Sequence, residues 1–138
     1  MIQTEQYYEL AFYTLAHTGE SFIYQHIVDA FAAQTADDTS KPITTFFALA
    51  GLYLFLEKNY TGLEVRNAHL QMAKVTKRFP AITLPDTRGA ITVSDVLAAP
   101  AGDDRDEMIR LWCISVWDAF SEQHSDVVAL TEKLLNAR

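Results

Sequence analysis

The sequence contains a single cysteine, Cys113, so an intrachain disulfide cannot form, which fits a reducing compartment. It has no basic N-terminal segment followed by an apolar run, and we therefore expect no secretory signal. The longest apolar run covers residues 46–56, including Gly51, whereas a membrane-spanning helix needs about 20 apolar residues. These absences together predict a cytoplasmic protein with no membrane partner.

Basic residues are also scarce, with 11 Lys and Arg against 18 Asp and Glu and a net charge of −7. Binding to nucleic acid phosphates needs clustered Lys and Arg, and here the basic residues are scattered. We therefore expect no nucleic acid partner, and we interpret the acidic excess as a solvated surface that favours solubility.

Several catalytic and binding motifs are missing. The sequence has no glycine-rich phosphate loop and no Gly-x-Ser-x-Gly elbow, which counts against nucleotide binding and against serine hydrolase chemistry. It has neither the His-Glu-x-x-His pattern of zinc proteases nor the Glu-x-x-His pattern of di-iron bundles. Cys113 shares an apolar helix face with Trp117 and Phe120, which is typical of an inert buried thiol.

What the sequence does contain is apolar residues at helical spacing. The 138 residues, 49% apolar and 21% charged, are ordinary for one globular domain covering residues 1–138. The spacing predicts an all-α fold, a compact bundle of five to seven helices. The predicted helices cover residues 4–17, 22–34, 42–59, 61–79, 92–99 and a final stretch from residue 103 to about 135.

The ends of these helices have recognisable signals. Pro42 suits a first helical turn, and Thr61 with Glu64, like Thr92 with Asp95, forms a capping box. Residues 80–91 contain two prolines and a glycine, so we expect an extended loop pressed on the bundle, or at most a short strand pair.

The last predicted helix leaves two alternatives open. Its apolar stripe continues in phase from Ile109 past His124 to Leu135, which favours one long, kinked helix. Ser125 and Asp126 would instead cap a new helix, with a break near His124.

Residues 22–34 form the stretch around which we expect the fold to be organised. This helix is apolar on nearly every side, so it should be buried together with the helix that contains residues 46–56. It nevertheless carries His26 and Asp29 one turn apart on the same face. Buried polar side chains need partners, and the rest of the chain must supply them.

Three of the four histidines, His26, His69 and His124, lie on apolar faces of three predicted helices. His17 instead falls at the end of the first helix. If the three faces meet in one core, three imidazoles join the carboxylate of Asp29, a ligand set suited to a divalent transition metal such as zinc, iron, nickel or manganese. The alternatives are a structural His–Asp hydrogen-bond network, or recognition of a small molecule without metal.

The chain also resembles a known family. The motif Phe-Ile-x-Gln-His-x-Val-Asp-Ala, which begins at Phe22, is similar to the core pattern of an uncharacterised family of short bacterial proteins. Further similar segments are residues 8–15, 41–43, 51–54, 67–69, 91–100 and 117–120. The resemblance implies a compact bacterial domain and implies no activity.

Two functions of different classes follow from these patterns. The first is a domain that binds a small ligand or a divalent metal, or an enzyme, with His26, Asp29, His69 and His124 in a partly buried site. The second is a structural or interaction protein that forms a homo-oligomer and uses its His–Asp network for packing. Tyr7, Tyr8 and Tyr24 are candidates for a pocket wall or a subunit contact. No pattern identifies catalytic residues or a substrate.

Overall fold

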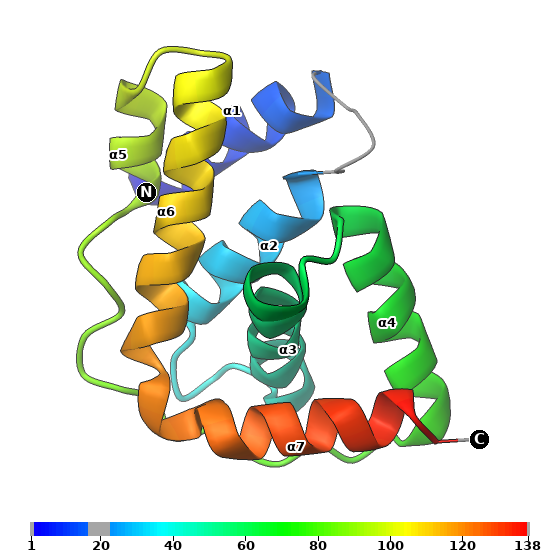
Figure 1. Ribbon diagram of the computed structural model, residues 1–138. Helices are drawn as coiled ribbons and strands as arrows, with labels where there is room; N and C mark the ends of the chain where they lie inside the picture. Colours follow the sequence, from blue (N-terminus) through cyan, green and yellow to red (C-terminus); the bar gives the residue numbers. More distant parts are fainter. Residues whose placement is uncertain (1, 17–22, 138) are drawn as a thin grey trace.

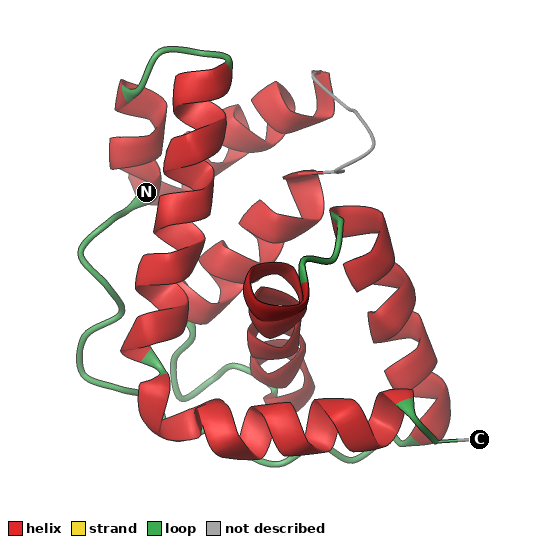
Figure 2. Ribbon diagram, viewed as in Figure 1, coloured by secondary structure: helices red, strands yellow, loops and turns green. Residues whose placement is uncertain are grey.

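The computed structural model describes residues 2–16 and 23–137, and all regular structure in these ranges is helical (Figure 2). The seven α-helices and one 3₁₀ turn of the described residues are α1 (Ile2–Ala16), α2 (Ile23–Thr35), α3 (Pro42–Lys58), α4 (Gly62–Val75), α5 (Val93–Ala98), α6 (Asp103–Ala119), η1 (Ser121–Gln123) and α7 (His124–Leu135). The predicted all-α class of five to seven helices is therefore confirmed. None of the described helices is long and apolar enough to cross a membrane.

Helix α3 lies at the centre of the molecule. It contacts α2, α4, α6 and α7, and Figure 1 shows it end-on with these helices around it. Nine of its residues are buried, which explains why its sequence has no polar face. Helix α2 packs on α3 and also contacts α1, α4 and α6. The two predicted inner helices are thus the inner helices of the fold.

The helix ends follow the predicted chemistry. Pro42 opens α3, and Asn59, with a φ of 60°, ends it in the left-handed conformation that asparagine tolerates. Before α4, the amide of Thr61 donates to Glu64 Oε1 at 2.9 Å, while the Glu64 amide donates to Thr61 Oγ1 at 3.2 Å. Before α5, the amide of Thr92 donates to Asp95 Oδ2 at 2.9 Å. Both capping boxes are therefore present.

Of the two alternatives for the last stretch, the break near His124 is the one found, and the favoured single long helix is wrong, because α6 ends at Ala119 and α7 begins at His124. The chain tightens after α6, where the Phe120 amide donates to the Trp117 carbonyl at 3.0 Å. The His124 ring stacks on Trp117 with 3.7 Å between ring centroids, and its Nε2 lies 2.7 Å from the same carbonyl. The His124 side chain thus hydrogen-bonds the Trp117 carbonyl at the end of α6, so this carbonyl keeps a partner although the helix stops.

Two other predicted boundaries also differ. Helix α4 ends at Val75 rather than 79, because Thr76 is extended and its hydroxyl hydrogen-bonds the backbone of Arg78. Helix α1 begins at Ile2 rather than Thr4. His17 and Phe22 lie outside the described residues.

Residues 80–91 form the predicted extended loop, with no strand pair among them. Arg88 holds this loop to the end of α2, donating to the carbonyls of Ala33, Ala36 and Pro85 at 2.8 to 3.1 Å. The bonds to Ala33 and Ala36 satisfy carbonyls at the C-terminal end of α2, where a cation is also favoured by the helix dipole. Gln34 adds a bond to the Ile91 carbonyl at 2.7 Å.

Candidate functional site

A cavity of about 330 Å³ lies among α2, α3 and α4. Its wall is mostly apolar, with four polar side chains inserted in it. The lining residues are Gln25, Val28, Asp29, Ala32, Ile43, Thr44, Phe47, Ala48 and His69. The cavity therefore brings together two of the side chains predicted for the site, Asp29 of α2 and His69 of α4.

Asp29 is a buried carboxyl without a charged partner. Its side chain accepts a hydrogen bond from Gln25 Nε2 at 3.1 Å through Oδ1, but Oδ2 is buried and has no hydrogen-bond partner among the described residues. No Lys or Arg forms an ion pair with it in the described part of the chain. Burial raises the pKa of Asp29 well above its usual value, so the protonated, uncharged form is favoured.

Gly51 of α3 provides the space that this carboxyl occupies. A Cβ atom built on Gly51 would overlap Oδ2 of Asp29 and would lie 3.1 Å from a methyl carbon of Val65. Glycine in a helix interior costs about 1 kcal/mol relative to alanine. Here the missing side chain allows the Asp29 carboxyl to lie directly against the α3 backbone.

His69 is fixed in one tautomer by the backbone of α3. Its Nε2 lies 2.8 Å from the Phe47 carbonyl, and because a carbonyl can only accept, Nε2 carries the proton. The ring also stacks on Phe47 with 4.7 Å between centroids. Burial lowers the pKa of His69 to about 4, so the ring is neutral near pH 7 and Nδ1 is an acceptor.

His26 lies one turn from Asp29 but is not among the residues that line the cavity. It is 2% exposed, stacks on Phe55 with 3.6 Å between centroids, and its Nδ1 has no partner among the described residues. Burial lowers its pKa to about 4. Cys113 of α6 donates its thiol to the His26 carbonyl at 3.7 Å. Burial raises the pKa of this thiol, which keeps it protonated and unreactive.

The structure does not bring all four predicted metal ligands to one cavity. His124 is held by Trp117 at the break between α6 and α7, and it does not line the cavity. Among the described residues, no group of three or more His, Cys, Asp or Glu side chains could hold a metal ion. The four-residue metal site stays a prediction, and the pair that shares a cavity is Asp29 and His69.

Sequence reasoning missed the residues that shape this cavity. Gln25 lies one turn before Asp29 and hydrogen-bonds it, and the carbonyl of Phe47 orients His69. Gly51 carried a readable signal, because glycine in a helix interior costs stability and is used where another group closely approaches the backbone. Thr44 carried none.

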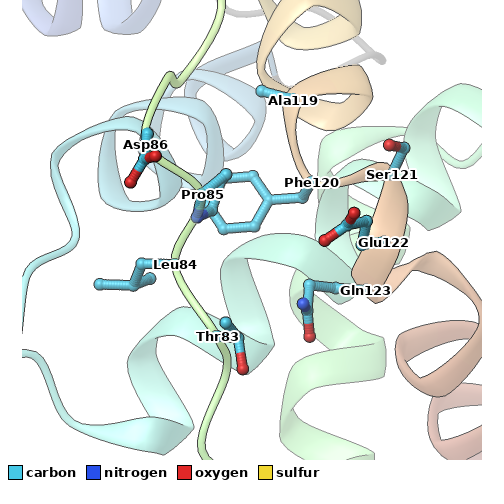
Figure 3. Close-up of a pocket in the computed structure, with 9 residues that line it drawn as sticks. All are labelled: Thr83, Leu84, Pro85, Asp86, Ala119, Phe120, Ser121, Glu122 and Gln123. Atoms are coloured by element: carbon cyan, nitrogen blue, oxygen red, sulfur yellow. The ribbon is translucent and has the colours of Figure 1, made fainter.

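A second cavity, of about 400 Å³, lies between the extended loop and the junction of α6 with η1 (Figure 3). Figure 3 shows the Phe120 ring beside Pro85, with the acidic side chains of Asp86 and Glu122 at the cavity. None of its described lining residues has a buried polar atom without a partner. It is therefore a weaker candidate than the cavity at Asp29.

The comparisons with known proteins give a family but no activity. The model of a family of unknown function, DUF5946, matches residues 4–121, which is most of the chain. No curated protein and no solved structure matches the chain.

The contact between Gly51 and Asp29 gives a first prediction. Gly51→Ala should destabilise the protein by about 1 to 3 kcal/mol, because the added methyl overlaps a buried carboxyl, although alanine is the better helix former. Urea unfolding measures the change. The double variant Gly51→Ala/Asp29→Ala should be more stable than Asp29→Ala alone, because the new methyl group then occupies the space that the carboxyl has left. A Gly51→Ala protein as stable as the wild type would contradict the packing described here.

The pKa of His69 gives a second prediction, on acid sensitivity. The unfolded chain takes up a proton near pH 6.5, whereas the folded ring resists protonation until about pH 4, so the unfolded state binds more protons between these values. Stability is therefore lost as the pH falls through this range. Between pH 7 and pH 5, the wild type should lose about 2 kcal/mol more unfolding free energy than His69→Gln. Equal losses in the two proteins would show that the ring is not buried in a neutral form.

Proposed function

The chain belongs to the DUF5946 family, and we propose that it binds a small, uncharged, largely apolar molecule in the cavity among α2, α3 and α4. One observation supports this most. A buried carboxyl, Asp29, lines this mostly apolar cavity, and its Oδ2, which lies against Gly51, has no hydrogen-bond partner among the described residues. Buried polar groups without partners are rare in proteins and are concentrated where function requires them.

The charges of the cavity support an uncharged ligand. No Lys or Arg is among the lining residues, so a phosphate or carboxylate would be desolvated without a counter-charge. The protonated Asp29 favoured by burial can donate one hydrogen bond and accept others. A carbonyl, hydroxyl or amide group of the ligand would satisfy it.

His69 supplies the complementary group. Because its Nε2 donates to the Phe47 carbonyl, its Nδ1 is the atom left to accept a hydrogen bond. A ligand that carries both a donor and an acceptor could therefore interact with His69 and Asp29 together. In an enzyme of this design, the same two side chains would act as proton acceptor and proton donor.

The size of the cavity limits the ligand. A volume of about 330 Å³ lies at the lower end of the range for small-molecule sites. At roughly 30 Å³ for each water-sized group, it admits a ligand of on the order of ten non-hydrogen atoms. A single ring with one or two polar substituents fits this limit.

A divalent transition metal is the second candidate, and the tautomer of His69 favours it. A metal-binding histidine usually donates its other ring nitrogen to a carbonyl or carboxylate, as His69 does to Phe47. Asp29 would serve as the carboxylate ligand after losing its proton. The remaining ligands would come from water or substrate, as in open metal sites.

Binding of small neutral probes tests the first candidate. We expect at least one of benzamide, indole, phenol and cyclohexanol to shift the NMR signals of Val28, Ile43 and the His69 ring in a saturable way. Ala32→Phe fills the cavity from its wall and should abolish binding. Asp29→Asn, which keeps the shape, should weaken binding about tenfold, the effect of one hydrogen bond to a buried group.

The control variant is Ser121→Phe in the second cavity, which should leave probe binding unchanged. If none of the probes shifts these signals, or if Ala32→Phe binds them as the wild type does, the proposed ligand site is wrong. The purely structural role of Asp29 would then be the better account.

Metal analysis tests the second candidate separately. Protein dialysed against Zn²⁺ or Co²⁺ and then against buffer should retain one equivalent of metal by elemental analysis. His69→Ala should lose it, because it removes the oriented imidazole, whereas His124→Ala should keep it. Retention that does not depend on His69, or no retention at all, would rule out a metal at this cavity.

A further inference from the structure

Among the described residues, large exposed apolar side chains are found on two helices. All six large apolar residues that are strongly exposed in the described part of the chain belong to α1 or α4. They are Tyr8, Phe12 and Leu15 of α1 and Leu63, Leu70 and Val75 of α4. Single exposed apolar residues are ordinary, but a contiguous group of them marks an interaction surface.

On α1 the exposed residues form a continuous stripe. Tyr8, Phe12 and Leu15 are 65%, 75% and 49% exposed. Their spacing, four residues and then three, is the spacing of a coiled-coil seam. Neighbouring Tyr7 instead turns inward and stacks on Phe31 with 4.2 Å between centroids. Tyr8 therefore points outward together with the other residues of the stripe, whereas the opposite side of α1 packs on the protein.

On α4 the exposed stripe has matching dimensions. Leu63 and Leu70 are 48% and 54% exposed and are separated by seven residues, the same separation as Tyr8 and Leu15. Helices α1 and α4, with 15 and 14 residues, are also nearly equal in length. Val75, five residues after Leu70, lies on another side of α4, so the α4 stripe consists of Leu63 and Leu70.

The charges beside the two stripes are opposite. Glu5 and Glu9 are exposed on α1, which contains no basic residue. Arg66 and Lys74 are exposed on α4 beside its leucines, while the exposed acid of α4, Glu64, is engaged in the capping box with Thr61. None of these charged side chains forms an ion pair within the described residues. Charges that flank an apolar seam select the partner helix. An acidic seam and a basic seam on one molecule are complementary to each other.

We propose that the chain forms a homodimer in which α1 of each copy packs on α4 of the other. Pairing α1 with α1 would place glutamates opposite glutamates, and pairing α4 with α4 would place basic residues together, so the charges disfavour both. The reciprocal arrangement uses both stripes of both copies. By symmetry it buries twice the area of one helix pair, which brings it nearer to the roughly 800 Å² per partner of a stable interface.

This dimer is independent of the cavity. His69 points to the cavity from another side of α4, and neither Asp29 nor His69 belongs to the stripes. The dimer therefore can be tested without knowledge of the ligand.

Reversal of charge tests the proposal. By light scattering coupled to gel filtration, the wild type should have twice the mass of the 15.5 kDa chain. Glu5→Lys/Glu9→Lys and, separately, Arg66→Glu/Lys74→Glu should each weaken dimerisation at least about tenfold, because like charges then meet across the interface. A matched control, Asp118→Lys/Glu122→Lys, reverses two exposed acids outside the stripes and should leave the dimer intact.

A mixture of the two reversed variants gives the decisive result. One variant has only basic stripes and the other only acidic ones, so an equimolar mixture should restore a dimer with one copy of each. This rescue also shows that both variants are folded. A monomeric wild type, a dimer insensitive to both reversals, or a mixture that stays monomeric would overturn the proposal.

Discussion

The contact between the Asp29 carboxyl and Gly51 is the constraint on which the rest of the structure depends. A carboxyl buried against a helix backbone must be neutral or paired, and no cation reaches it among the described residues. It fits only because the central helix has no side chain at residue 51. The two inner helices therefore approach at a point where a polar group replaces ordinary apolar packing. The candidate cavity lies beside that point, and the histidine across it is neutral as well.

Neutrality connects the parts of this site. Two imidazoles and a carboxyl lie in or near the α2–α3–α4 cavity, and burial favours the uncharged form of each. Such a set costs less desolvation than three charges would, but it leaves donors and acceptors that need partners. The Phe47 carbonyl provides one partner and Gln25 another, while Oδ2 of Asp29 has none among the described residues. Small-molecule binding and metal binding are the two functions proposed for the cavity beside this carboxyl.

Much of the fold was predictable from the sequence, because helical periodicity and capping are local properties. Both capping boxes, the burial of α2 and α3 and the extended loop 80–91 followed from residue patterns. The break after α6 was only one of two alternatives, since the apolar stripe stays in phase across it, and the contact of His124 with Trp117 that accompanies the break is tertiary. Likewise, apolar periodicity placed Asp29 and His69 inside but could not show which of three histidines shares a cavity with the carboxyl. That depends on how the helices cross, which is a tertiary property.

The protonation state of Asp29 tests this account most directly. Carbon-13 NMR of the aspartate carboxyl groups, followed across the acidic and neutral pH range, distinguishes a protonated from an ionised side chain. The account predicts one aspartate that stays protonated well above pH 4, and the same signal should be absent in Asp29→Asn. If all aspartates titrate together near their usual pKa, the buried neutral carboxyl is wrong, and the proposed site is wrong with it.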